Sequence, residues 1–209
     1  MEDIKNVSLY LPGLGMGITR GVISHYFEIK KIDSQLLLGG VSYKNLYISI
    51  LKSTAERTIQ FGIYNKKKNK PYEAIIYSSI GVTMTNIPYI CKIIKSNFFV
   101  NSNINRYRLL NYASYILIKS MGGSVIFMHN FDYAIRNKLN EYVISFITSI
   151  GIWTITYPLD TIFHRYLIGI NNYYNLYRGI QYPLIRSAFN TISGLFVYNK
   201  INSYLKDIK

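Results

Sequence analysis

The sequence predicts an all-α membrane protein in which six transmembrane helices form three pseudo-repeats around a central cavity. Three observations favour this fold class. The basic residues Lys52, Lys119 and Arg186 are equally spaced, because 119 minus 52 and 186 minus 119 are both 67. An aromatic residue follows each of them at the same distance, at Tyr64, Phe131 and Tyr198. Six mostly apolar stretches follow one another along the chain, as expected for a repeat architecture in a bilayer.

Each of the six stretches is close to the ~20 residues that cross a bilayer core. They cover approximately residues 8–30, 45–65, 72–94, 109–131, 143–165 and 183–203. The chain of 209 residues is then one domain with repeats of approximately 1–69, 70–137 and 138–209. Residues 143–157 are mostly apolar around the whole helix circumference. A soluble helical bundle whose charged faces point to water is the alternative.

The composition limits the function classes. Lys and Arg number 24 against 10 Asp and Glu, so the partner is nucleic acid, an anionic lipid surface or an anionic small molecule. Cys91 is the only cysteine and the three histidines are scattered, so we expect neither a metal site nor a cofactor. No nucleophile or carboxylate pair has an arrangement typical of catalysis, and we expect no enzyme.

Charged residues interrupt the apolar stretches and are expected to face a wet interior. Each would cost roughly 2.5–3.5 kcal/mol if it faced lipid. They are Arg20, Lys52, Glu56, Arg57, Lys119 and Arg186. Three equally spaced cations at one level of a threefold structure would make an anion site. The alternative is that Lys52 and Lys119 reach a lipid headgroup.

Gly13, Gly17 and Gly21 recur every four residues and therefore share one helix face. Small residues on one face let a neighbouring helix approach closely, so we expect this face to pack against another helix. A flexible glycine-rich start next to Pro12 is the alternative. Trp153 is expected in the core or facing lipid, because a single tryptophan is more often a packing residue than a ligand contact.

The last third of the chain contains a motif of a known family. Tyr157-Pro158-Leu159-Asp160 ends a hydrophobic stretch, and Tyr177-Arg178-Gly179 precedes Arg186 and Tyr198. This order resembles the third repeat of a mitochondrial carrier. The chain is similar to a short and degenerate member of that family, since no copy of the signature is complete. The resemblance implies a monomer in the mitochondrial inner membrane, bound by lipids that include anionic ones such as cardiolipin.

The resemblance implies a gate on the matrix side, at the ends of the odd-numbered helices. Its residues here are Glu28, Lys31, Pro88, Lys95, Pro158, Asp160 and Arg165. Proline kinks a helix, which would bring the three odd helices together at this mouth. In the family each acid pairs with a base of the adjacent repeat, which couples Asp160 to Lys31. The other two bridges are missing, because Glu28 would face Ile93, and Ile90 would face Phe163.

The resemblance also implies a second gate at the opposite mouth, where carriers have an aromatic residue followed by an acid at the end of each even-numbered helix. Phe131-Asp132 retains the acid, whereas Tyr64 and Tyr198 precede asparagines. Lys68 keeps the base of the first copy, and Arg136 is one residue out of register. Both gates therefore depart from the family pattern.

On the family pattern, substrate contacts lie twelve residues before each terminal aromatic. They are Lys52, Lys119 with Ser120, and Arg186, to which Arg20 adds a fourth cation. A cavity lined by these cations without acids concentrates anions. The implied function is alternating-access transport of a small anionic metabolite, either a carboxylate, a phosphate or a nucleotide. The alternatives are a non-transporting membrane protein on a carrier scaffold and a soluble basic protein that binds nucleic acid, although we expect no nucleic-acid partner.

Overall fold

The described part of the chain is helical. The computed structural model describes residues 8–36, 46–95, 106–171 and 173–207. Within these residues there are six long helices and no strand. The helices are α2 (Leu11–Leu36), α3 (Leu46–Lys66), α4 (Pro71–Lys95), α5 (Arg106–Arg136), α6 (Glu141–Ile168) and α7 (Gln181–Asp207). The predicted all-α class is therefore confirmed for this part of the chain.

The local sequence explains where α6 begins and ends. The Asn140 side chain accepts hydrogen bonds from the backbone N–H groups of Tyr142 (3.0 Å) and Val143 (3.2 Å), which caps the first turn. At the other end Gly169 adopts a φ of 82°, a left-handed conformation that glycine takes without steric cost. These caps extend α6 slightly beyond the expected stretch of residues 143–165.

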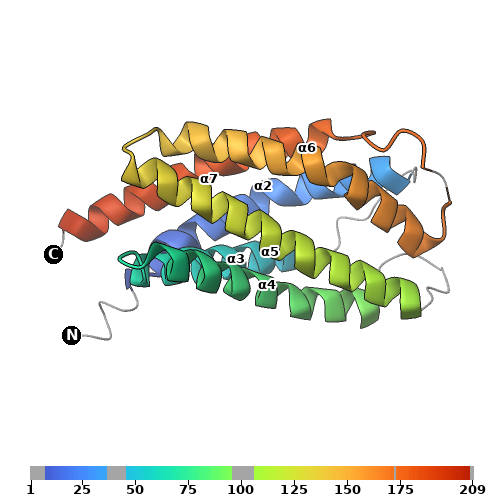
Figure 1. Ribbon diagram of the computed structural model, residues 1–209, viewed down its shortest axis with the longest axis horizontal. Helices are drawn as coiled ribbons and strands as arrows, with labels where there is room; N and C mark the ends of the chain where they lie inside the picture. Colours follow the sequence, from blue (N-terminus) through green and yellow to red (C-terminus); the bar gives the residue numbers. More distant parts are fainter. Residues whose placement is uncertain (1–7, 37–45, 96–105, 172, 208–209) are drawn as a thin grey trace.

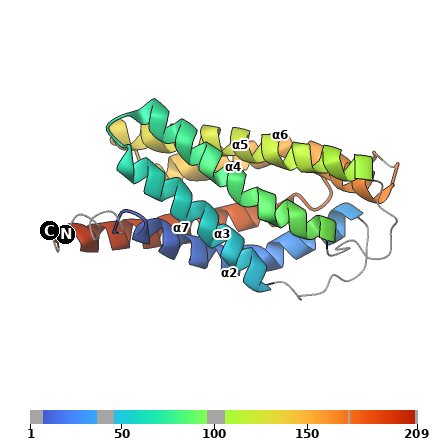
Figure 2. The ribbon, with the colours of Figure 1, turned by 90° about the horizontal axis from the view of Figure 1, so that it is seen from below.

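The six helices form a closed ring. Each helix packs against the next one along the chain, and α7 packs against α2. Figures 1 and 2 show a long bundle in which the α3–α4 and α5–α6 turns lie at the same end as the start of α2 and the end of α7. We call this the terminal end, and the opposite end, which holds the α6–α7 connection, the far end. Each predicted repeat contains two consecutive helices.

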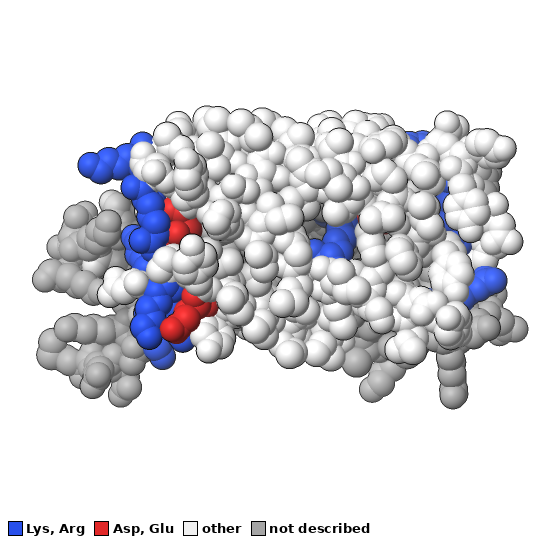
Figure 3. Space-filling model, in the orientation of Figure 1, with Lys and Arg blue, Asp and Glu red and all other residues white. Residues whose placement is uncertain are grey.

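Polar side chains are buried in the bundle while many large apolar side chains are exposed. Buried polar residues include Gln60, Ser78, Ser79, Asn86, Ser145, Ser149, Ser187, Asn190 and Thr191. More than half of the side-chain surface is exposed at Leu51, Ile118, Ile147, Ile155, Phe189, Ile192 and Phe196. Figure 3 shows a middle region almost free of charge on this face, with most charged groups at the ends. The interior thus contains polar side chains as well as an apolar core, and the outer faces carry many large apolar side chains.

One helix in the described part of the chain is long and apolar enough to cross a membrane by composition alone. It comprises the 27 residues Glu141–Leu167. Core helices of soluble proteins also pass this test. Within the described residues, the other predicted stretches do not pass it.

The glycine face of α2 packs against the backbone of α3. A Cβ atom added at Gly17 would lie 2.5 Å from Thr54 Cα, and one at Gly21 would lie 2.6 Å from Ile50 Cα. A Cβ atom at Gly13 would collide with the carbonyl oxygen of Arg57. The three glycines thus let two helices approach at backbone contact distance, as their spacing predicts.

We expect the substitution Gly17→Ala to lower the free energy of unfolding by about 1–3 kcal/mol, because α3 has to move away from the added methyl group. Gly151→Ala is the matched control, since nothing lies within 4 Å of a Cβ atom there. Thermal unfolding of both variants in detergent measures the difference. Equal midpoints for the two variants would contradict the close contact between α2 and α3.

Candidate functional site

A cavity of about 360 Å³ lies inside the ring, and all six helices contribute to its wall. The three equally spaced cations Lys52, Lys119 and Arg186 line it, together with Arg20 and Ser120. The structure thus brings together every residue that was predicted to contact substrate. A volume of this size suits a small metabolite.

The wall also contains acids, which corrects the expectation of an acid-free cavity. Glu28, Glu56 and Asp160 line it. The six cations on the wall are Arg20, Lys31, Lys52, Arg57, Lys119 and Arg186, so the positive excess over the three carboxylates is three. The family pattern placed Glu28 and Asp160 only at the gate, and their side chains reach further inward. The cavity remains net basic.

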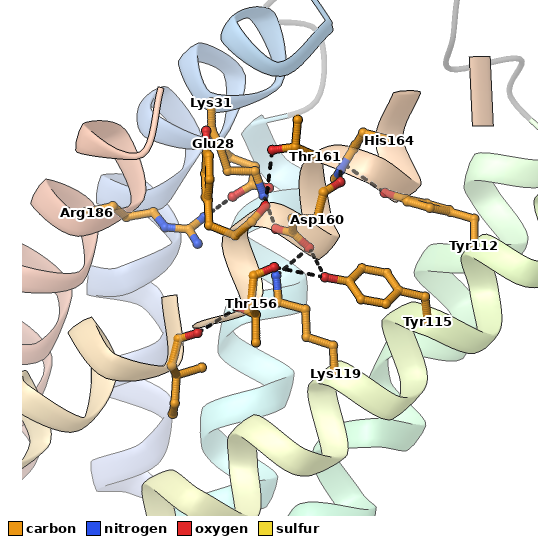
Figure 4. Close-up of polar contacts among 12 residues, drawn as sticks. Glu28, Lys31, Tyr112, Tyr115, Lys119, Thr156, Asp160, Thr161, His164 and Arg186 are labelled. Atoms are coloured by element: carbon orange, nitrogen blue, oxygen red, sulfur yellow. Dashed lines mark hydrogen bonds and ion pairs between the residues drawn. The ribbon is translucent and has the colours of Figure 1, made fainter. Parts of the chain in front are cut away.

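Asp160 on α6 connects helices of three repeats. Its Oδ1 atom lies 2.6 Å from Lys119 Nζ, and its Oδ2 atom lies 3.2 Å from Lys31 Nζ. The Tyr115 hydroxyl also donates a hydrogen bond of 2.6 Å to Oδ1. Figure 4 shows these groups converging on the carboxylate from α2, α5 and α6. The ion pair between Asp160 and Lys31, which the family resemblance implied, is present, and Lys119 joins it.

Glu28 bridges α2 and α7. Its carboxylate lies 2.8 Å from Lys31 Nζ and forms an ion pair with Arg186. The expectation that Glu28 would face Ile93 is therefore replaced by a contact to a predicted substrate ligand, and the side chain of Ile93 lies outside the described residues. The sequence reasoning missed this pair because it treated gate and cavity residues as separate levels.

Trp153 lies at the centre of the cationic groups, which corrects its expected place in the core or against lipid. Its ring is 4.3 Å from Lys119 Nζ, 4.7 Å from Arg186 Cζ and 5.1 Å from Lys31 Nζ. Cations over an aromatic face are attracted by the ring quadrupole. Trp153 therefore lines the cavity and helps to hold three positive groups close together.

The remaining residues of the predicted matrix-side gate have other surroundings. Arg165 is buried, and its Nη1 atom donates a hydrogen bond of 2.7 Å to the backbone oxygen of Tyr174, in the α6–α7 connection. Pro88 and Pro158 lie inside α4 and α6, which continue past them. The side chains of Lys95 and Ile90 lie outside the described residues. Phe163 stacks on Tyr115 at 4.2 Å.

A buried aromatic cluster lies between the cavity and the terminal end. We define it by Phe61, Tyr64, Phe131 and Tyr198. Phe61 contacts both Phe131 (5.4 Å between ring centroids) and Tyr198 (4.6 Å). The equally spaced aromatics thus contact one another, whereas the equally spaced cations line one cavity. They close this side of the bundle by apolar packing.

The predicted residues of the opposite gate lie beside this cluster. Asp132 accepts a 2.8 Å hydrogen bond from the Tyr64 hydroxyl and pairs with Arg136 on its own helix at 2.6 Å. Arg136 also donates a hydrogen bond of 3.0 Å to the backbone oxygen of Lys68. The side chain of Lys68 itself is exposed. The Tyr198 hydroxyl donates to Asn65 Oδ1 at 2.8 Å. Hydrogen bonds of tyrosine therefore join the repeats here.

His164 and Tyr112 line the cavity beside Asp160. Neither residue was predicted from the sequence as a site residue. His164 Nδ1 lies 2.7 Å from the backbone oxygen of Asp160, so this nitrogen carries the proton, and Nε2 accepts from the Tyr112 hydroxyl at 3.0 Å. No spacing rule reveals this contact, because it depends on how α5 and α6 are rotated. Among the described residues, no group of three or more His, Cys, Asp or Glu side chains could hold a metal ion.

Comparisons with known protein families, with curated proteins and with solved structures find no match to this chain.

Proposed function

We propose that this chain spans a membrane as a six-helix bundle of the carrier type and transports a small anionic metabolite through its central cavity. The transported class is a carboxylate, a phosphate or a nucleotide. The mechanism is alternating access, in which the two mouths of the cavity open in turn. The inner mitochondrial membrane is the proposed location, on the resemblance to mitochondrial carriers.

The observation that carries the proposal is the convergence of the equally spaced cations. Lys52, Lys119 and Arg186 lie on three helices of three repeats and line one cavity. Repeats that fold alike place equivalent residues at the same level of the structure, which accounts for this convergence. A net positive, partly dehydrated cavity attracts anions.

The membrane location is supported by the charged side chains of the helices, several of which line the central cavity. Each of α2, α3, α5 and α7 carries a charged residue on the cavity wall, for example Arg20, Lys52, Lys119 and Arg186. Such residues lower the hydropathy of a helix without being exposed to lipid. The exposed apolar side chains of the outer faces fit a hydrocarbon environment.

The ion pairs of Asp160 and Glu28 are suited to act as one gate, because they join α2, α5, α6 and α7 across the bundle. Opening the far end would require these pairs to separate. The aromatic cluster is suited to act as the other gate. Anion binding to Lys119 or Arg186 would compete with the two carboxylates and so favour separation of the pairs.

A non-transporting membrane protein is the second candidate, and the terminal end favours it. Asp132 pairs with Arg136 on its own helix rather than with a base of another repeat. A gate of buried aromatic residues has fewer polar contacts to exchange during opening than a gate of ion pairs. In this case the cavity would bind an anion without releasing it to the other side.

Uptake by purified protein in liposomes of phosphatidylcholine and cardiolipin tests the proposal. The probes are radiolabelled phosphate, malate and ATP. We expect uptake of at least one probe above that of empty vesicles, and its loss in Arg186→Ala. Uptake equal to that of empty vesicles for all three would reject transport. Alkaline extraction of membranes serves as a control, because a soluble nucleic-acid-binding protein would leave the pellet.

A further inference from the structure

Some cations of the cavity form ion pairs with carboxylates of the protein, and others do not. Lys119 and Lys31 contact Asp160, Arg186 contacts Glu28, and Lys52 lies 3.8 Å from Glu56. A ligand anion at Lys119 or Arg186 therefore has to displace a carboxylate of the protein. These residues are poorly placed to be its first attachment point.

Two arginines on the same wall make no direct ion pair within the described residues, although the Glu56 carboxylate acts on both of them at longer range. They are Arg20 on α2 and Arg57 on α3, two helices that pack against each other. Arg20 Nη1 and Arg57 Nε are both buried and have no hydrogen-bond partner. An unsatisfied buried donor on a charged group is costly, and an acceptor that reaches it regains that free energy.

Both side chains are held in place by neighbours that leave donors free. The stem of Arg20 lies against Gly194, where an added Cβ atom would come within 3.2 Å of Arg20 Cγ. Arg57 donates to Gln60, whose amide in turn donates to Ser124 Oγ at 2.9 Å, and its guanidinium lies 5.7 Å from the Phe127 ring centroid. Side chains that are fixed before binding lose little entropy when a ligand arrives.

We infer that Arg20 and Arg57 together form the primary attachment site for a carboxylate or phosphate group of the ligand. Planar guanidinium groups donate paired hydrogen bonds to the oxygens of such groups, which a lysine cannot do. The inference rests on the proposed function and refines it, because it moves the anion away from the equally spaced cations. Lys119 and Arg186 then act in the ion pairs that close the cavity.

The test is binding of free inorganic phosphate and succinate to the full-length protein in lipid-free detergent, measured by thermal shift and by calorimetry. The variants Arg20→Lys and Arg57→Lys keep the positive charge but lose the planar donors. We expect each to weaken binding about tenfold or more, since a hydrogen bond to a charged group is lost. Arg186→Lys is expected to change affinity less than threefold. Arg108→Lys is the matched control, because Arg108 lies near the start of α5 over the Tyr166 ring and does not line the cavity.

The outcomes separate this inference from the proposed function. Loss of binding in Arg186→Lys with normal binding in Arg57→Lys overturns the inference and leaves transport possible. Absence of binding of both probes to the unsubstituted protein also overturns it, as does a shift seen only with anionic lipid added. The melting temperature without probe shows whether each variant is folded. If Arg57→Lys is unstable, Gln60→Ala, which removes the acceptor that orients Arg57, is expected to weaken binding in the same direction.

Discussion

Replacing Asp160 by alanine is expected to lower the free energy of unfolding of the detergent-solubilised protein by about 3–5 kcal/mol, the range for breaking one side of a buried ion pair. The carboxylate is only 4% exposed and contacts Lys31, Lys119 and Tyr115. Its removal takes the ion-pair partner from Lys119 and leaves Lys31 with Glu28 alone. The loss should therefore exceed that of any single hydrogen bond in the bundle.

Glu73→Ala is the control for this experiment. Glu73 also pairs with two lysines, Lys67 at 2.8 Å and Lys70 at 3.2 Å, but at the surface of the α3–α4 turn. Water and salt screen such pairs, so this variant should unfold almost as the unsubstituted protein does. Chemical unfolding followed by tryptophan fluorescence measures both. A loss at Asp160 no larger than that at Glu73 would show that the network does not hold the helices together.

The substitution Phe61→Ala is expected to have an effect of similar size, about 3–5 kcal/mol, because it leaves a cavity in a well-packed cluster. Phe61 is fully buried between Phe131 and Tyr198. Because the aromatic cluster lies between the cavity and the terminal end, we expect removal of the Phe61 ring to open a path between them. We therefore expect vesicles that contain this variant to leak the transported anion passively.

Phe196→Ala is the matched control, since this ring is 58% exposed on the outer face of the same bundle. It should change neither the unfolding midpoint in detergent nor the passive anion flux by a comparable amount. Flux and unfolding are measured on the same preparations. If Phe61→Ala and Phe196→Ala behave alike, the aromatic cluster does not close the cavity.

The helices and the meeting of the spaced residues could be predicted from the sequence. Apolar stretches of about 20 residues set the helix positions, and the 67-residue interval from Lys52 to Lys119 to Arg186 indicated one shared level. The glycine spacing predicted a close helix contact, and the structure supplies its partner as α3. These features depend on local periodicity, which a single sequence displays.

The arrangement inside the cavity could not be predicted in the same way. The contact of Glu28 with Arg186 depends on how each helix is rotated about its axis and on the conformation of long side chains. The same is true of the contact of Trp153 with Lys119. Arg57 was expected to face the interior, but nothing in its spacing distinguished it from Glu56 beside it. Trp153 and His164 have no counterparts at the repeat interval, so the repeat gave no reason to select them.

Cysteine labelling in liposomes shows whether the bundle encloses a wet basic cavity and turns its outer faces to lipid. Cys91 is first replaced by serine, and single cysteines are then placed at Ser187, on the cavity wall and 4% exposed, and at Ile192, on the outer face and 56% exposed. A small anionic, water-soluble methanethiosulfonate is the reagent. We expect the cysteine at position 187 to react and the one at position 192 to be protected by lipid. Rapid labelling at position 192 with none at position 187 would show that the outer faces meet water and that the cavity is closed to it.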